Sequence, residues 1–146
     1  MVNKLPESVL VVIHTTDLRV LLLERSDHPG WWQSVTGSLE RGETTEQAAI
    51  REINEETGLQ AQNYSLQNWK HINRYEIYPC YRHRYAPDVT HNTEHVFSLC
   101  LPVPLDITLS PHEHLQYEWL PASLAAEACF SPSNQAAIRI LLERAS

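Results

Sequence analysis

The sequence predicts an α/β protein, a sandwich in which helices cover a mixed β-sheet. Short runs of aliphatic and β-branched residues lie on both sides of one strong helical pattern at residues 44–57. Two further helical patterns follow near the C-terminus, at residues 121–129 and 133–144. Strands that flank a central helix and are followed by C-terminal helices are typical of this class.

Several segments are predicted to be β-strands because aliphatic, β-branched or aromatic residues dominate them. They are residues 8–14, 19–25, 32–36, 66–78, 93–101 and 115–120. The first two form a hairpin across the turn-like residues Thr15, Thr16 and Asp17. The stretch at residues 79–92 is interpreted as a functional loop.

The helical pattern at residues 44–57 has a capping residue at one end and a glycine at the other. Thr44 or Thr45 can cap the N-terminus, and Gly58 can end the helix in a left-handed conformation. The apolar positions recur at helical spacing and are expected to face the core: Ala49, Ile50, Ile53 and the Thr57 methyl group.

Length and composition are those of a single folded domain, which we place at residues 1–146. Hydrophobic residues make up 42% of the chain and charged residues 20%, and both values are typical of globular proteins. The formal net charge of −7 argues against a nucleic-acid-binding protein, which needs a basic face. A phosphorylated small molecule is compatible with this charge, because bound metal ions can supply positive charge.

Cysteine spacing and the lack of a long apolar run indicate a cytoplasmic protein. Cys80, Cys100 and Cys129 are widely separated, so we expect reduced thiols rather than a disulfide framework or a cysteine zinc site. The apolar run at residues 9–13 is too short for a signal segment or a membrane span. We therefore expect no membrane or nucleic-acid partner, and we favour a monomer.

Three glutamates in the helical segment have the spacing that brings side chains to one helix face. Glu52, Glu55 and Glu56 are related by steps of three and four residues. Such a cluster repels itself, and a hard divalent cation such as Mg²⁺ removes the repulsion. The alternative is an acidic, solvated helix face, which is the usual meaning of an isolated group of this kind.

Other residues around the cluster favour the metal-binding interpretation. Gly37 permits a tight backbone turn, and Gly58 permits the helix to stop. Glu43 precedes the helix, where a carboxylate can accept hydrogen bonds from free amides or from a loop. Arg51 can pair with Glu55 one turn later or reach back to Glu43.

Residues 37–59 resemble the Nudix family, whose motif G-x5-E-x7-R-E-U-x-E-E-x-G-U (U, aliphatic) they match at every specified position. The resemblance implies a Nudix-type α/β/α sandwich with a mixed β-sheet and a catalytic loop–helix–loop motif. It also implies an enzyme that depends on Mg²⁺, for which Mn²⁺ can substitute. The reaction implied is hydrolysis of a phosphoanhydride bond in a substrate that carries a linked diphosphate.

The same resemblance assigns roles to four residues of the motif. Glu52, Glu55 and Glu56 are expected to bind the metal, and Arg51 is expected to orient Glu52 and Glu55. Glu52 or a later glutamate would position or deprotonate the attacking water.

Many members of the family have one further acidic residue, shortly before an aromatic residue, after the motif. Glu113 has this setting and is assigned as an additional metal ligand or as the general base. Strand alternation would place the flanking His112 and His114 on the opposite face, so we expect neither to be a ligand. The alternative for Glu113 is a surface carboxylate in a loop.

Residues 32–38 and 82–94 resemble one branch of the Nudix family, the bacterial dihydroneopterin triphosphate pyrophosphatases of folate synthesis. The resemblance implies conversion of 7,8-dihydroneopterin triphosphate and water to the monophosphate and pyrophosphate. One alternative is a Nudix enzyme for oxidised nucleoside triphosphates, dinucleoside polyphosphates or ADP-ribose. Another is a ligand-sensing Nudix-like module without activity, which the complete set of motif carboxylates argues against.

A pterin is a flat heterocycle that needs an apolar wall and a few polar groups. Tyr75, Glu76, Ile77 and Tyr78 precede the special loop and are assigned to this task. Tyr75 or Tyr78 could stack on the ring, and the Glu76 carboxylate or local backbone could bond its amino-pyrimidine edge. The alternative is that these are ordinary strand residues.

The triphosphate needs cations and hydrogen-bond donors. By the resemblance, Lys4 and Arg25 face the phosphate-binding cleft; the alternative for Lys4 is a surface lysine near the chain terminus. Thr36, which lies beside Gly37, could contact the substrate. Ser131 could cap the last helix or donate a hydrogen bond to the ligand.

Two arginines of the loop are expected to brace it. Arg82 and Arg84 have Asp88 and Glu94 as acidic neighbours in the sequence, so we favour ion pairing within the loop over phosphate binding.

Overall fold

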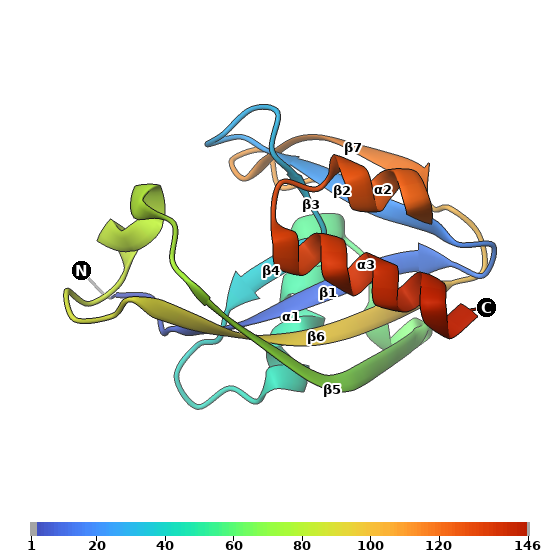
Figure 1. The fold of residues 1–146 in the computed structure, drawn as a ribbon. Helices are drawn as coiled ribbons and strands as arrows, with labels where there is room; N and C mark the ends of the chain where they lie inside the picture. Colours follow the sequence, from blue (N-terminus) through green and yellow to red (C-terminus); the bar gives the residue numbers. More distant parts are fainter. Residues whose placement is uncertain (1–2, 146) are drawn as a thin grey trace.

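The computed structural model describes residues 3–145 and has three layers: helices, a sheet, and helices. Figure 1 shows α1 on one face of the sheet and α2 and α3 on the other. The elements are β1 (Glu7–Thr15), β2 (Arg19–Arg25), β3 (Trp32–Gln33), β4 (Val35–Ser38), α1 (Thr45–Thr57), η1 (Ala61–Asn63), β5 (Ser65–Glu76), η2 (Pro79–Arg84), β6 (His91–Leu101), β7 (His114–Pro121), α2 (Ala122–Ala128) and α3 (Pro132–Ala145). The predicted α/β sandwich is confirmed.

The sheet is mixed because its central pair of strands is parallel. It has seven strands in the order β3-β2-β1-β6-β5, with β4 paired to β1 and β7 paired to β2. β1 runs parallel to β6, and β1–β2, β1–β4, β2–β7 and β5–β6 are antiparallel. The predicted hairpin of the first two strands is present, with His14 opposite Val20.

Alternation along β1 distributes its side chains between two cores. Val9, Val11 and Ile13 face α1 and belong to one buried cluster, whereas Leu10 and Val12 belong to the cluster beneath α2 and α3. A strand covered on both faces becomes continuously apolar, which explains the unbroken hydrophobic run seen in the sequence. A pocket lies at one end of the sheet, beside α1.

Helix α1 begins and ends as the sequence predicts. Thr44 is the N-cap and forms a capping box with Gln47, whose backbone amide donates to the Thr44 hydroxyl at 3.1 Å. Gly58 ends the helix at φ 76°, in the left-handed region. Ala49, Ile53 and Thr57 are buried as expected, while Ile50 is only partly buried.

Two predicted segments differ in detail. Residues 32–36 form two short strands, β3 and β4, which pair with different partners. The loop at residues 79–92 contains the short 3-10 helix η2.

All three cysteines are free, as expected, and no helix within residues 3–145 has the length and apolar character needed to cross a membrane.

Candidate active site

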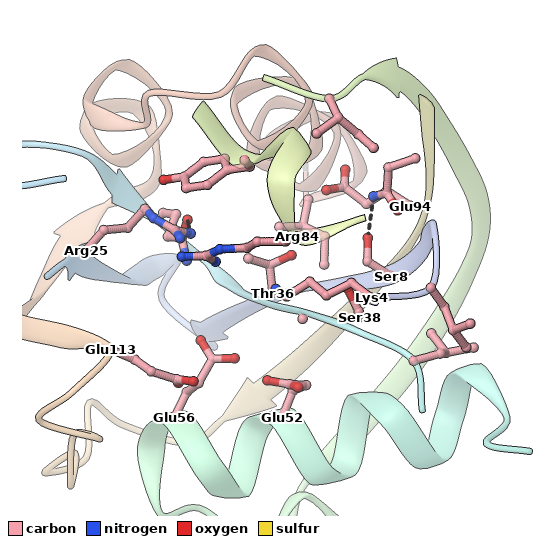
Figure 2. Close-up of a pocket in the computed structure, with 18 of the residues that line it drawn as sticks. Lys4, Ser8, Arg25, Thr36, Ser38, Glu52, Glu56, Arg84, Glu94 and Glu113 are labelled. Atoms are coloured by element: carbon pink, nitrogen blue, oxygen red, sulfur yellow. Dashed lines mark hydrogen bonds between the residues drawn. The ribbon is translucent and has the colours of Figure 1, made fainter. Parts of the chain in front are cut away.

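A pocket of about 820 Å³ lies between α1, the sheet end and η2. Figure 2 shows Glu52 and Glu56 rising from α1 on one side, with Glu113 beside Glu56. Glu94 lies across the pocket beside Ser8. The pocket thus has an acidic end over α1 and a second end over β6, and it is large enough for a nucleotide-sized ligand.

Glu56 is the most deeply buried charged residue of the acidic end. The residue is 1% exposed, and within residues 3–145 neither carboxylate oxygen has a hydrogen-bond partner. His114 Nε2 lies 3.7 Å from Glu56 Oε1, which is beyond hydrogen-bond range. Burial lowers the pKa of His114 to about 4, so this imidazole is neutral and does not neutralise the carboxylate.

Like-charged neighbours add to the cost of ionising Glu56. Burial raises the pKa of Glu56 well above its ordinary value, and the carboxylates of Glu52 and Glu113 raise it further. A buried, unpaired carboxylate is unfavourable unless a cation compensates it. A bound cation would neutralise the negative charge of this site, and the unsatisfied oxygens of Glu56 could coordinate it.

Arg51 binds the motif carboxylates together and connects the helix to the preceding loop. Its Nε and Nη2 donate to Glu43 at 2.8 Å each, and its Nη1 donates to Glu52 at 2.7 Å and to Glu55 at 3.3 Å. Nη2 also donates to the Ser38 carbonyl at 3.0 Å. The predicted pairing of Arg51 with Glu43 and Glu55 is confirmed, and Glu43 in addition accepts from the Glu40 amide.

Gly37 is needed for a different reason from the tight turn that the sequence suggested. It lies within strand β4, and a Cβ atom at this position would be 2.2 Å from Cδ of Glu52. Only glycine leaves room for this carboxylate beside the strand. The Glu52 side chain is consequently held between Arg51 and the β4 backbone.

The two histidines beside Glu113 face the pocket, although strand alternation predicted that they would lie on the opposite face. Glu113 precedes β7, which begins at His114, and strand alternation does not apply to a turn. His112, Glu113 and His114 all line the pocket, so the prediction that the histidines lie on the opposite face is wrong. Glu55, by contrast, has a half-exposed side chain and does not contribute to the pocket wall.

Three basic side chains lie between the two ends of the pocket. Lys4, Arg25 and Arg84 all line it, which places the predicted Lys4 and Arg25 where phosphates could be bound. Although Lys4 keeps much of its surface exposed, partial desolvation in the cleft lowers its pKa, and so do the charges of Arg84 and Arg25. A polyanion would relieve the repulsion within this group.

Asp27 joins the two arginines. Arg25 donates to both carboxylate oxygens of Asp27 at 2.8 Å, and Arg84 Nη2 donates to it at 3.2 Å. The Tyr81 ring lies 4.8 Å from the Arg25 guanidinium and 5.1 Å from that of Arg84. Arg84 therefore pairs with Asp27 from a distant loop, and the prediction that it pairs with Asp88 or Glu94 within its own loop is wrong. Arg82 is exposed.

Aromatic residues form part of the wall at the other end. Tyr75, Ile77 and Tyr78 line the pocket, in agreement with their predicted positions. Sequence reasoning missed a stack in which Trp31 lies between His28 and Phe130, at centroid distances of 3.4 and 4.3 Å. No short-range pattern indicated the complete stack, because Phe130 is distant in the sequence from His28 and Trp31.

Two of the predicted substrate residues also have structural partners. The Thr36 hydroxyl donates to the Val9 carbonyl at 2.9 Å, and Thr36 lines the pocket beside Gly37. Ser131 caps α3 by accepting from the Asn134 amide at 3.3 Å, and it too lines the pocket.

Glu76 is not in the pocket, and the prediction that it meets the heterocycle is wrong. It is the exposed member of the alternating pair at the end of β5, where Tyr75 faces inward and Glu76 faces solvent. The carboxylate that does line this end is Glu94 of β6, which is 4% exposed. The sequence drew attention to Glu94 only as a partner for an arginine.

Comparison with known proteins identifies the family. The profile of the NUDIX domain matches residues 4–141, which is nearly the whole chain and includes the α1 carboxylates and Glu113. The chain belongs to the Nudix family. Nudix hydrolases generally use divalent metal ions.

Closely similar proteins come from one branch of the Nudix family. The dihydroneopterin triphosphate diphosphatase of Escherichia coli (strain K12) is 49% identical over 140 residues, 94% of this chain and 92% of the relative. The enzyme of the same name from Haemophilus influenzae is 43% identical over 136 residues, 91% of this chain and 85% of that one. The solved structure of the E. coli dihydroneopterin triphosphate pyrophosphohydrolase has a TM-score of 0.92 and 46% identity, with 99% of each chain covered.

The acidic end fits a divalent cation by the chemistry of its donors. Hard cations such as Mg²⁺ prefer carboxylate oxygens, and Glu56 offers two that are unpaired within the described residues. Across residues 3–145 no three acidic, histidine or cysteine side chains are already gathered around one point. The contacts explain this, because Glu52 and Glu55 are turned toward Arg51.

Proposed function

We propose that this Nudix protein hydrolyses 7,8-dihydroneopterin triphosphate to the monophosphate and pyrophosphate, with Mg²⁺ as its cofactor and Mn²⁺ as a substitute. The observation that carries the proposal is one continuous pocket with an acidic end, a cationic middle and an aromatic, polar far end. The identity of 49% to an enzyme named for this reaction supports the choice of substrate.

The residues at the acidic end of the pocket would bind the metal and accept a proton. Glu52, Glu56 and Glu113 would hold the metal, with Glu55 as a further candidate ligand, and Arg51 keeps Glu52 in position. The bound cation would neutralise phosphate charge and polarise a phosphoryl oxygen. A cleft carboxylate accepts the proton of the attacking water, and Glu52 and Glu113 are the candidates for this role.

The remaining groups bind the substrate. Lys4, Arg25 and Arg84 would hold the phosphates, and Arg25 and Arg84 are pre-oriented by Asp27. Tyr75, Ile77, Tyr78, Thr36 and Ser131 would enclose the remainder of the molecule. A largely preformed site of this kind reduces the entropy lost on binding.

The test is a comparison of kcat/KM for dihydroneopterin triphosphate, GTP, dGTP and ATP at one Mg²⁺ concentration, with product identification. We expect the pterin triphosphate to lead and pyrophosphate to be the first phosphorus product. A nucleoside triphosphate that wins by tenfold, about 1.4 kcal/mol of transition-state stabilisation, contradicts the substrate assignment. Orthophosphate as first product contradicts the cleavage position, and full activity in excess chelator contradicts the metal requirement.

A further inference from the structure

The far end of the pocket contains two buried acceptor groups on neighbouring same-face positions of β6. Asn92 and Glu94 are 1% and 4% exposed, both line the pocket, and alternation puts them on the same side of the strand. Neither residue had a role in the phosphate chemistry described above. Glu94 lies on the side of the pocket away from the α1 carboxylates (Figure 2).

Asn92 presents an acceptor without a partner. Its amide nitrogen donates to the Ser8 hydroxyl at 2.8 Å and to the Tyr75 hydroxyl at 3.1 Å, which fixes the orientation of the side chain. Its carbonyl oxygen is buried and has no hydrogen-bond partner within residues 3–145. A buried unsatisfied acceptor is costly, and a ligand N–H donor would satisfy it.

Glu94 is held from behind by neutral donors. Asn73 Nδ2 donates to Glu94 Oε1 at 3.2 Å, and Asn73 in turn contacts His71 at 3.2 Å. Burial raises the pKa of the Glu94 carboxyl, and Ser133 and Asn73 partly offset this effect. A buried carboxylate with such partners gains from additional N–H donors at its pocket side.

We propose that Glu94, assisted by Asn92, recognises a ring N–H and the adjacent exocyclic amino group of the substrate's heterocycle. The two oxygens of a carboxylate accept two N–H groups that lie side by side, and this donor pair is found on 2-amino-4-oxo-pyrimidine rings. Pterins and guanine share that edge. The inference deepens the proposed function, on which it rests for the choice of a pterin, by naming the specificity-determining residue.

The proposed contact would discriminate against bases that lack this donor pair. Adenine has a ring nitrogen acceptor beside its amino group, and an acceptor that faces a carboxylate is repelled. Hypoxanthine keeps the ring N–H but lacks the amino group. Inosine triphosphate therefore differs from GTP by the one group whose recognition is proposed.

The experiment measures inhibition constants of GTP and inosine triphosphate against hydrolysis of whichever substrate, dihydroneopterin triphosphate or ATP, the enzyme turns over faster. The proteins are the wild type, Glu94→Gln and Glu76→Gln. Glu76→Gln is the matched control, because the same chemical change is made at the exposed end of β5. Melting temperature and Mg²⁺-dependent turnover establish that the variants are folded.

We expect the wild type and Glu76→Gln to prefer GTP over inosine triphosphate by about tenfold or more, the effect of a hydrogen bond to a charged group. Glu94→Gln should reduce the preference to less than about threefold and weaken dihydroneopterin triphosphate binding by about 10- to 100-fold. A wild type without the preference overturns the proposal, whatever the variant does. So does a Glu94→Gln protein that keeps it.

The outcome is separable from that of the proposed function. A preference for GTP that depends on Glu94, in an enzyme that does not hydrolyse dihydroneopterin triphosphate, supports this inference and contradicts the proposed function. Efficient hydrolysis of dihydroneopterin triphosphate without any dependence on Glu94 supports the proposed function and overturns this inference.

Discussion

The two buried glutamates of the pocket, Glu56 and Glu94, have the same burial and opposite surroundings. They are 1% and 4% exposed, and burial is the main cause that raises the pKa of each. Glu56 has carboxylate neighbours and unpaired oxygens, whereas Glu94 has an amide donor and a hydroxyl-bearing neighbour. Burial alone therefore does not specify the ligand of a carboxylate. A buried carboxylate beside other carboxylates is stabilised by a bound cation, whereas one that already accepts from neutral donors is stabilised by further neutral N–H donors.

The largest expected effect is on turnover at the acidic end. Glu56→Gln and Glu52→Gln each keep the side-chain shape and remove a charge that holds metal, so each should lower kcat by at least about 10²-fold. Steady-state kinetics at saturating Mg²⁺ measures this loss. A variant with wild-type kcat would mean that the residue is a structural carboxylate only.

The next largest effect is expected from a methyl group at position 37. Gly37→Ala places a Cβ 2.2 Å from Cδ of Glu52, which must move, and we expect kcat to fall by between about 10- and 100-fold. Gly42→Ala is the control, because nothing lies within 4 Å of its added Cβ although its φ is +80°. The control should lose stability through backbone strain while it keeps kcat. Equal kcat values in both variants would argue against the close approach.

Metal binding should distinguish the two glutamates by stability. Mg²⁺ at ten times its Kd should stabilise the wild type by about 1.4 kcal/mol, seen as a higher Tm than in chelator. Glu94→Gln should keep this increment, and Glu56→Gln should lose most of it. An increment that is lost in Glu94→Gln but kept in Glu56→Gln would reverse the assignment of the two ends.

The smallest effect concerns the positioning of Glu94. Asn73→Ala removes the amide that donates to Glu94 Oε1 and should cost about 1 kcal/mol of substrate binding, roughly a fivefold rise in KM. Because Asn73 does not line the pocket, kcat should remain near the wild-type value. A fall in kcat at unchanged KM would show that its role is not to orient Glu94.

The sequence by itself determined the features that depend on local spacing. The bounds of α1, a threonine N-cap at Thr44 or Thr45, the C-terminal Gly58, and the common helix face of Glu52 and Glu56 follow from helical periodicity and capping chemistry. The contacts of Arg51 with Glu43 and Glu55 are also local, because the residues are joined by one helix and its preceding loop. These elements could be predicted because they involve residues close together in the chain.

Tertiary structure alone decided the other end of the pocket. The face on which a strand residue lies depends on register, and β5 contains an irregularity between Asn68 and His71 that resets its alternation. Hence the outward direction of Glu76 could not be obtained from spacing along β5. The inward direction of Glu94 was decided by which face of β6 lines the pocket. The Asp27–Arg84 contact joins residues 57 positions apart for the same reason: side chains distant in the chain meet only when the sheet and loops have folded around them.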